Sequence, residues 1–285
     1  MLRASIFIAG LLVISIIIYP TRSAFAQTAY TGCGGVNSPP VTNAAYEQIV
    51  IELVNAQRAA NGNLPPLKRQ DTLDQAARYY AIDMAFDYYF EFDHATYDRN
   101  PNHALVRVCD APQRLGSYYP SYSGIGENIA GGQVTPQEVV HSWMESSGHR
   151  ANILSTFYRE IGVGYYPGGM YGSTWVQDFG KQDDVYPLVI NREDSTVQNR
   201  VVNLYIYGQG SWSEMRLRND NLSWGNWQSF RSELSWTLED LPGLRTVWIE
   251  LRQGTQTYTT SDTITYNPPP TISMDYVIFL PLTIR

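Results

Sequence analysis

The stretch GHRANIL at residues 148–154, followed by IGVGY at residues 161–165, decides the fold of this chain. The first stretch predicts a short helix, with a serine and a glycine at its start and His149 in its first turn. In the second stretch, Ile, Val and Tyr alternate with two glycines, which predicts a strand with one bare face. A histidine placed where a helix meets a glycine-opened surface can point into a cleft.

A third motif, GENIAGG at residues 126–132, lies upstream, and a helix containing Trp143 separates it from GHRANIL. Together these motifs resemble the CAP superfamily of cysteine-rich secretory proteins, antigen 5 and pathogenesis-related proteins, also called the SCP domain. The bacterial branch resembles them best. The resemblance extends from Tyr46 to Gly180. It implies an α-β-α sandwich with a cleft that contains two histidines and two glutamates.

The resemblance assigns the cleft residue by residue. The first histidine is His94 in the sequence FDH, the first glutamate is Glu127 in GENIA, and the second histidine is His149 in GHR. The second glutamate is expected three residues after the tryptophan of the preceding helix, but Ser146 occupies that position. Glu145 lies one residue earlier, about 100° round a helix. This is a departure from the pattern of the family.

Two imidazoles and one carboxylate can bind Zn²⁺ or another divalent cation and leave a coordination position open. His94 and His149 are the expected metal ligands, and Glu127 is the candidate general base of a hydrolase. Spacing alone does not indicate a metal site, because the sequence has no HxxxH pair that would lie on one helix face. The alternative for Glu127 is a structural role, in which its carboxylate accepts backbone N–H groups of the following turn.

Three functions follow from this cleft. The first is a non-enzymatic exported module that binds a small ligand or a divalent cation, with a second domain as spacer or adhesive. The second is a metal-assisted hydrolase, most plausibly a peptidase, and the third is binding of a lipid or sterol. The departure at Ser146 favours the first. The ligand is expected to be a small molecule, a lipid or a peptide.

Residues 1–26 carry the features of a secretory signal peptide. Arg3 precedes an apolar run over residues 4–19, and Ala24-Phe25-Ala26 is a small-x-small cleavage site. The alternative is an uncleaved membrane anchor, although the run is short for a span. Without Arg3 and Arg22, 18 basic residues face 27 acidic ones, a net charge of −9. The sequence therefore predicts an exported protein with no later transmembrane segment and no nucleic-acid partner.

The chain contains two cysteines, Cys33 and Cys109. In an exported protein such a pair predicts a disulfide, and two free thiols are the alternative. The bridge would pin the N-terminal segment onto the first domain.

Hydrophobic periodicity divides the chain into an extended lead-in (27–44), an α+β domain (45–181), an all-β domain (186–267) and a tail (268–285). In the first domain we expect helices over 45–60, from Asp71, and from Thr135 to Ser146. A strand hairpin is expected over 160–166 and 173–179. Residues 92–123, which contain His94 and His103, are expected to be an irregular loop. His141 and Glu145 are expected to form a surface pair.

The second domain shows period-two alternation in several short segments separated by turn residues, which predicts a β-sandwich. The sequences MRLRND (215–220) and WGNW (224–227) resemble a bacterial immunoglobulin-like repeat. Five of the seven tryptophans lie here, at positions 212, 224, 227, 236 and 248. They are expected to be core residues, and an exposed platform that stacks on sugars is the alternative. Contact with a cell surface or polysaccharide would use this domain.

Overall fold

The structure, a computed structural model, describes residues 30–34, 38–87 and 93–270. The predicted signal peptide and all but the first residues of the predicted tail lie outside this range. Within the described residues, no helix combines the length and the apolar character that a membrane span requires.

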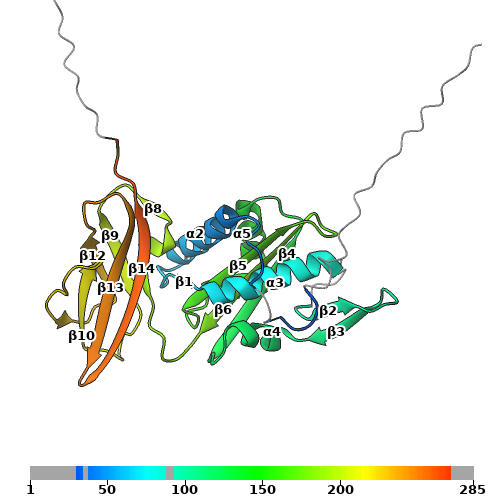
Figure 1. The fold of residues 1–285 in the computed structure, drawn as a ribbon, viewed down its shortest axis with the longest axis horizontal. Helices are drawn as coiled ribbons and strands as arrows, with labels where there is room; N and C mark the ends of the chain where they lie inside the picture. Colours follow the sequence, from blue (N-terminus) through cyan, green and yellow to red (C-terminus); the bar gives the residue numbers. More distant parts are fainter. Residues whose placement is uncertain (1–29, 35–37, 88–92, 271–285) are drawn as a thin grey trace, which may run out of the picture.

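The first part of the chain forms a four-stranded mixed sheet with helices on both faces, and a separate two-stranded sheet (Figure 1). Its elements are α2 (Ala44–Ala60), β1 (Lys68–Arg69), α3 (Asp71–Asp87), β2 (Thr96–Arg99), β3 (Leu105–Cys109), α4 (Ala111–Tyr118), β4 (Gly124–Gly131), α5 (Pro136–Glu145), α6 (Ser147–Leu154), β5 (Glu160–Pro167) and β6 (Ser173–Lys181). The strand order is β1-β5-β6-β4. The predicted helices and the β5–β6 hairpin are confirmed, and so is the α+β class.

The helix α3 packs on the face of β5 that carries only glycines, Gly162 and Gly164. A Cβ added to Gly162 would lie 2.1 Å from the carbonyl carbon of Leu73, and one added to Gly164 would lie 2.2 Å from that of Ala77. The side chains of Ile161 and Val163 point to the other face, into a core shared with α2, α5 and α6. The alternation in IGVGY therefore places a helix at backbone contact on one face and an apolar core on the other.

The prediction of an irregular loop over residues 92–123 is wrong. This segment contains the β2–β3 hairpin and the helix α4. Asp110 and Gln113 form a capping box at the start of α4. Most of β3 is exposed, so its sequence carries no clear alternation of buried and exposed residues. The GENIA motif, for which no element was predicted, forms β4 at one edge of the sheet.

The predicted disulfide is confirmed. Cys33 and Cys109 are bonded with an S–S distance of 2.05 Å. The backbone N–H of Gly32 also donates to the carboxylate of Asp98 in β2, at 3.0 Å. The bridge and this hydrogen bond attach the N-terminal segment to the β2–β3 hairpin.

The second part of the chain is the predicted all-β sandwich. Its elements are β7 (Leu188–Ile190), the 3-10 turn η1 (Asn191–Glu193), β8 (Thr196–Val197), β9 (Val201–Ile206), β10 (Glu214–Asn219), β11 (Gln228–Ser229), β12 (Glu233–Thr237), β13 (Gly243–Gln253) and β14 (Gln256–Tyr266). One sheet has the order β11-β10-β13-β14-β8 and the other β12-β9-β7. Their inner faces share one apolar core. The boundary between the two predicted domains, which lies between residues 181 and 186, stays a prediction.

The tryptophans of the sandwich fall into two groups. Trp212 and Trp236 pack against the core, as predicted. For the other three the core prediction is wrong, because they lie on the outer face of the larger sheet and stack on arginines. Over the Trp227 ring, the guanidinium carbon lies 3.9 Å from the ring centroid for Arg252 and 4.6 Å for Arg216. The guanidinium carbon of Arg218 lies 4.8 Å from the ring centroid of Trp224 and 5.3 Å from that of Trp248.

The first part of the chain, up to Lys181, is called the first unit, and the β-sandwich is called the second unit. The second unit packs beside α2 and β1 of the first (Figure 1). Lys68 Nζ lies 2.8 Å from Glu193 Oε1 and 2.5 Å from Asp262 Oδ1, so one lysine of the first unit pairs with two carboxylates of the second. The Tyr207 hydroxyl donates to the carbonyl of Pro66 at 3.1 Å. These polar contacts join the two parts of the chain.

Candidate functional site

The candidate site lies at the β4 edge of the first sheet. His94 precedes β2, and its Nδ1 lies 2.9 Å from Oε1 of Glu127 in β4. The His94 side chain is 41% exposed, whereas that of Glu127 is 4% exposed. His94 has a φ of 68°, a left-handed conformation that is unfavourable for a residue with a Cβ. The structure thus brings together two of the predicted cleft residues, which are far apart in sequence.

Arg114 of α4 holds the other oxygen of Glu127. Its Nη2 lies 2.6 Å from Glu127 Oε2, its Nη1 donates to Thr96 Oγ1 at 2.6 Å, and its guanidinium stacks 3.5 Å from the ring centroid of Tyr80. Burial alone would raise the pKa of Glu127, but the charge of Arg114 and the hydrogen bonds from His94 and Arg114 hold that pKa below its ordinary value. Glu127 is therefore a carboxylate, and it does not serve to cap the following turn.

Asp178 of β6 lies directly opposite Glu127 in the β4–β6 ladder. Its side chain is fully buried. Burial, and then the negative charge of Glu127, raise the pKa of Asp178 well above its ordinary value, which favours the neutral form of Asp178 beside the Glu127 carboxylate. Sequence reasoning missed Asp178 and Arg114, because only the strand register and the position of α4 bring them to Glu127.

His149 approaches the site from α6. Its backbone carbonyl accepts from Asn128 Nδ2 at 3.1 Å, and Asn152 Nδ2 donates to the backbone carbonyl of Glu127 at 3.2 Å. These amide side chains fasten α6 to β4. Partial burial, and then the nearby charge of His94, lower the pKa of His149, which favours a neutral imidazole. The two asparagines, which belong to the GENIA and GHRANIL motifs, thus position the second histidine.

Glu145 lies elsewhere. It is exposed and lines a hollow of about 440 Å³ between α2, α5 and α6, together with His141 and Arg150. Arg150 donates to the carbonyl of Met144 at 2.8 Å. Ser146, the residue at the position expected for the second glutamate, is the N-cap of α6. The structure therefore does not place Glu145 with His94, Glu127 and His149.

Two histidines contribute to the candidate site, His94 beside Glu127 and His149, whose pKa the charge of His94 lowers. An ionised carboxylate can only accept, so Nδ1 of His94 donates to Glu127, and Nε2 is directed away from that carboxylate. His149 supplies the second imidazole. Both oxygens of Glu127 are already occupied by His94 and Arg114. Two imidazoles suit a divalent cation that also takes solvent ligands. Among the described residues, however, His94, Glu127 and His149 do not form a group whose ligand atoms all lie within 4.8 Å of one another, so the metal site stays a prediction.

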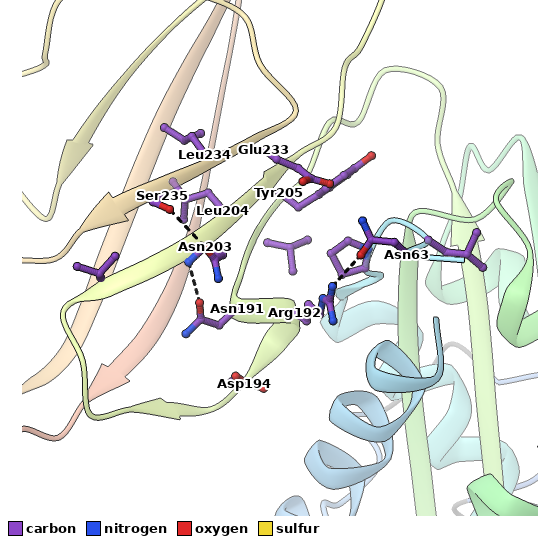
Figure 2. A pocket seen from close by; sticks show the side chains of 14 residues that line it. Asn63, Asn191, Arg192, Asp194, Asn203, Leu204, Tyr205, Glu233, Leu234 and Ser235 are labelled. Carbon is purple, nitrogen blue, oxygen red and sulfur yellow. Dashed lines mark hydrogen bonds between the residues drawn. The ribbon is translucent and has the colours of Figure 1, made fainter. Parts of the chain in front are cut away.

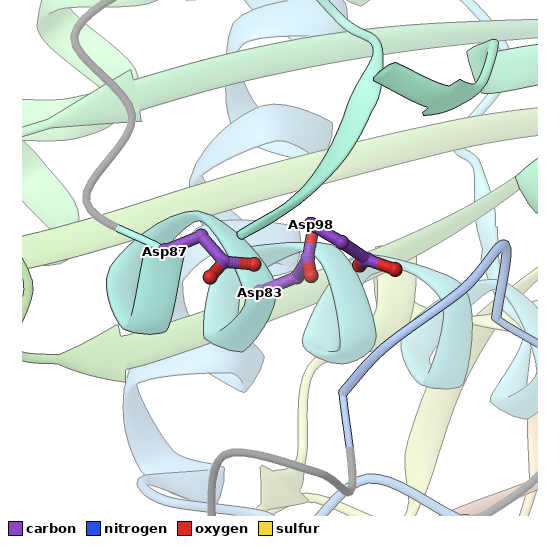
Figure 3. A group of neighbouring side chains, drawn as sticks. All are labelled: Asp83, Asp87 and Asp98. Atoms are coloured by element: carbon purple, nitrogen blue, oxygen red, sulfur yellow. The ribbon is translucent and has the colours of Figure 1, made fainter. Parts of the chain in front are cut away.

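Three other carboxylates gather where α3 meets β2. Asp83 and Asp87 of α3 and Asp98 of β2 each bring an oxygen within 4.8 Å of the other two (Figure 3). Burial, and then the charge of Asp98, raise the pKa of Asp87 to about 6. Within the described ranges, this is the only group of three or more His, Cys, Asp or Glu residues gathered closely enough to hold a metal ion.

Part of the chain is similar to known proteins. Residues 51–179 match the family model of the cysteine-rich secretory protein family, CAP. Over 143 residues the chain is 42% identical to the uncharacterised protein YkwD of Bacillus subtilis. The matched segment covers 50% of this chain and 49% of YkwD. The chain thus spans about half the length of this relative.

Two solved structures are similar to about half of the chain. An extracellular protein with an SCP domain from Bacillus anthracis is 25% identical, with a TM-score of 0.40, covering 48% of this chain and 40% of that one. An outer surface protein of Borrelia burgdorferi is 23% identical, with a TM-score of 0.40, covering 48% and 92% respectively.

Proposed function

Residues 51–179 belong to the CAP family of cysteine-rich secretory proteins, and from that premise we propose that this chain is an exported, non-enzymatic CAP module. It binds a divalent cation, or a small ligand that contacts the same imidazoles, at His94 and His149. The β-sandwich serves as a spacer or adhesive part. The observation that carries the proposal is the 2.9 Å contact between His94 Nδ1 and Glu127 Oε1, which directs Nε2 away from Glu127 as the ligand atom of the proposed site.

The contacts of Glu127 favour a role in orienting His94. Metal-binding histidines commonly donate their second ring N–H to a carboxylate, which fixes the tautomer and the direction of the ring. Arg114, fully buried, holds that carboxylate in place. A divalent cation bound there would supply Lewis acidity and would join the loop before β2 to α6. The chain's own residues contribute orientation and a low pKa for His149, which keeps its imidazole neutral.

The same contacts count against the hydrolase alternative. A general base must accept a proton, and its pKa is best near the working pH. Glu127 has a pKa below its ordinary value, and both of its oxygens are engaged by Arg114 and His94. The lipid alternative gains no support at this cleft, where the neighbours of the histidines are charged and amide side chains.

Export is supported by the sequence of residues 1–26 and by the disulfide. Bridges such as Cys33–Cys109 form and persist in oxidising compartments outside the cytosol.

The experiment that tests this proposal is a Zn²⁺ titration monitored by the melting temperature. Zinc at about 100 times its dissociation constant should raise the melting temperature by roughly 5–10 °C. His94→Ala and His149→Ala should each abolish most of this shift. The shift should also shrink below about pH 6, where protons compete with the cation for the imidazoles.

The matched control is His141→Ala, which removes an exposed histidine from the separate hollow on α5. It should leave the zinc shift unchanged, and so should Glu145→Gln. An equal zinc shift in the wild-type protein and in the His94→Ala, His149→Ala double variant would refute cation binding at this cleft.

A further inference from the structure

A groove of about 690 Å³ runs between the two units, apart from the histidine cleft (Figure 2). One wall is the loop Asn63–Pro66 of the first unit. The other consists of η1 and the outer face of the β9–β12 pair. Tyr205 faces Glu233 and Asn203 faces Ser235 across this pair, so their side chains share one face. The volume lies within the range of small-molecule sites, about 300–1,000 Å³.

The backbone around this groove is strained on both sides. Asn63 has a φ of 50°, and the consecutive residues Asn191, Arg192 and Glu193 have φ values of 44°, 62° and 71°. Left-handed conformations in residues with a Cβ are costly, and they persist where the surrounding structure fixes them, often at ligand sites. These left-handed residues come from both units and lie around one groove, which indicates that the groove has a defined shape.

Hydrogen bonds across the interface hold that shape. Arg192 Nη2 donates to Asn63 Oδ1 at 3.0 Å, and Asn55 Nδ2 donates to the carbonyl of Arg192 at 2.9 Å. On the sandwich side, Asn191 Oδ1 accepts from the backbone N–H of Asn203 at 2.8 Å. A ligand would thus meet a preformed site, and little of its binding energy would be spent on ordering the protein.

The lining chemistry specifies the ligand class. Amide side chains at Asn191 and Asn203, a carboxylate at Glu233 and a hydroxyl at Ser235 offer donors and acceptors at short spacing, which suits neighbouring hydroxyl groups. Tyr205 adds an aromatic ring to the same face. We propose that this interdomain groove binds a neutral oligosaccharide, with Tyr205 against a sugar ring and the amides and Glu233 on its hydroxyls.

The charges in the groove exclude other classes. Glu233 and Asp194 are acidic and Arg192 is basic, and the whole chain is acidic, so a polyanion would be repelled. The lining is mainly polar, so an apolar ligand would leave these groups desolvated without partners. This proposal does not depend on cation binding at His94, and the zinc titration can fail without affecting it.

The test is binding of the full-length mature protein to an array of neutral and anionic oligosaccharides. Titration of cellotetraose, maltotetraose and tri-N-acetylchitotriose, followed by NMR, should then give dissociation constants. We expect at least one neutral oligosaccharide to bind. Tyr205→Ala should weaken binding about tenfold or more, as loss of an aromatic anchor does. Because Tyr205 also contacts Tyr207, the exposed Asn203→Ala is the second variant, and it should weaken binding with an unchanged melting temperature.

The matched control is Trp227→Ala, which removes a ring from the arginine-stacked face of the other sheet. It should leave binding unchanged. The proposal is overturned if no neutral oligosaccharide binds at concentrations up to about 10 mM. It is equally overturned if Asn203→Ala and Tyr205→Ala bind as the wild type does, if Trp227→Ala abolishes binding, or if only anionic oligosaccharides bind.

Discussion

At the scale of single residues, Arg114 is the side chain on which the histidine site depends. It is fully buried, and its partners are Glu127, Thr96 and the ring of Tyr80. Replacing Arg114 with Met would leave Glu127 as a buried charge without its cation, and breaking such a pair costs roughly 3–5 kcal/mol. We expect Arg114→Met to lower the free energy of unfolding in urea by about this amount, and to weaken zinc binding because His94 loses its fixed partner.

The matched control is Arg107→Met. Arg107 pairs with Asp110 three residues away, and both side chains are mostly exposed, at 61% and 54%. Exposed pairs contribute about 0–1 kcal/mol. A loss at Arg114 no larger than that at Arg107 would show that Glu127 does not need its buried partner.

At the scale of secondary-structure elements, the fit of α3 against β5 depends on glycine. Because a Cβ at Gly162 would lie 2.1 Å from the backbone of Leu73, the helix must move if any side chain is introduced. Gly162→Ala should lower the free energy of unfolding by about 2–4 kcal/mol, as overpacking of a core does. Chemical denaturation measures this loss.

Gly148 of α6 provides the comparison. A Cβ there would meet nothing within 4 Å, and its φ is not in the left-handed region. Gly148→Ala should therefore be neutral or stabilise by up to about 1 kcal/mol, since alanine favours helix more than glycine does. If both substitutions have the same effect, close packing of α3 is not what selects glycine at Gly162.

The same elements show how far sequence reasoning reached. Helices with clear caps and apolar stripes, such as α5 after Thr135, were predicted to within about a residue, because their signals are local. The β2–β3 hairpin and β4 were missed, because short exposed or edge strands carry weak alternation. His94, Glu127 and His149 came from the family resemblance. Arg114 and Asp178 join them only through tertiary packing, which no local pattern encodes.

At the scale of the whole molecule, the two units meet at a buried cluster of one cation and two carboxylates. Lys68 lies within 2.8 Å of Glu193 and 2.5 Å of Asp262, and Asp262 also accepts from the backbone N–H of Ile190 at 2.7 Å. One lysine cannot neutralise two buried carboxylates. Burial, and then the charge of Asp262, raise the pKa of Glu193 to about 8.

This raised pKa predicts how the stability of the joined units depends on pH. Between about pH 5 and pH 8 the unfolded chain has lost the proton of Glu193, whereas the folded protein still holds it. The unfolded state then binds fewer protons, so stability falls as the pH rises through this window. Glu193→Gln mimics the protonated form at every pH. It should match the wild type near pH 5 and exceed its free energy of unfolding by about 2–4 kcal/mol at pH 8.

The measurement is urea unfolding of both proteins at pH 5, 6.5 and 8. Carboxyls elsewhere with raised pKa values, such as Asp74 and Asp87, act equally in both proteins and cancel in the difference. Glu145→Gln, an exposed change away from the interface, should follow the wild type at all three values. A constant difference between Glu193→Gln and the wild type from pH 5 to pH 8 would mean that Glu193 is ionised in the folded protein. Lys68 would then hold both carboxylates as anions, and any pH dependence that Glu193 adds to stability would lie below about pH 5.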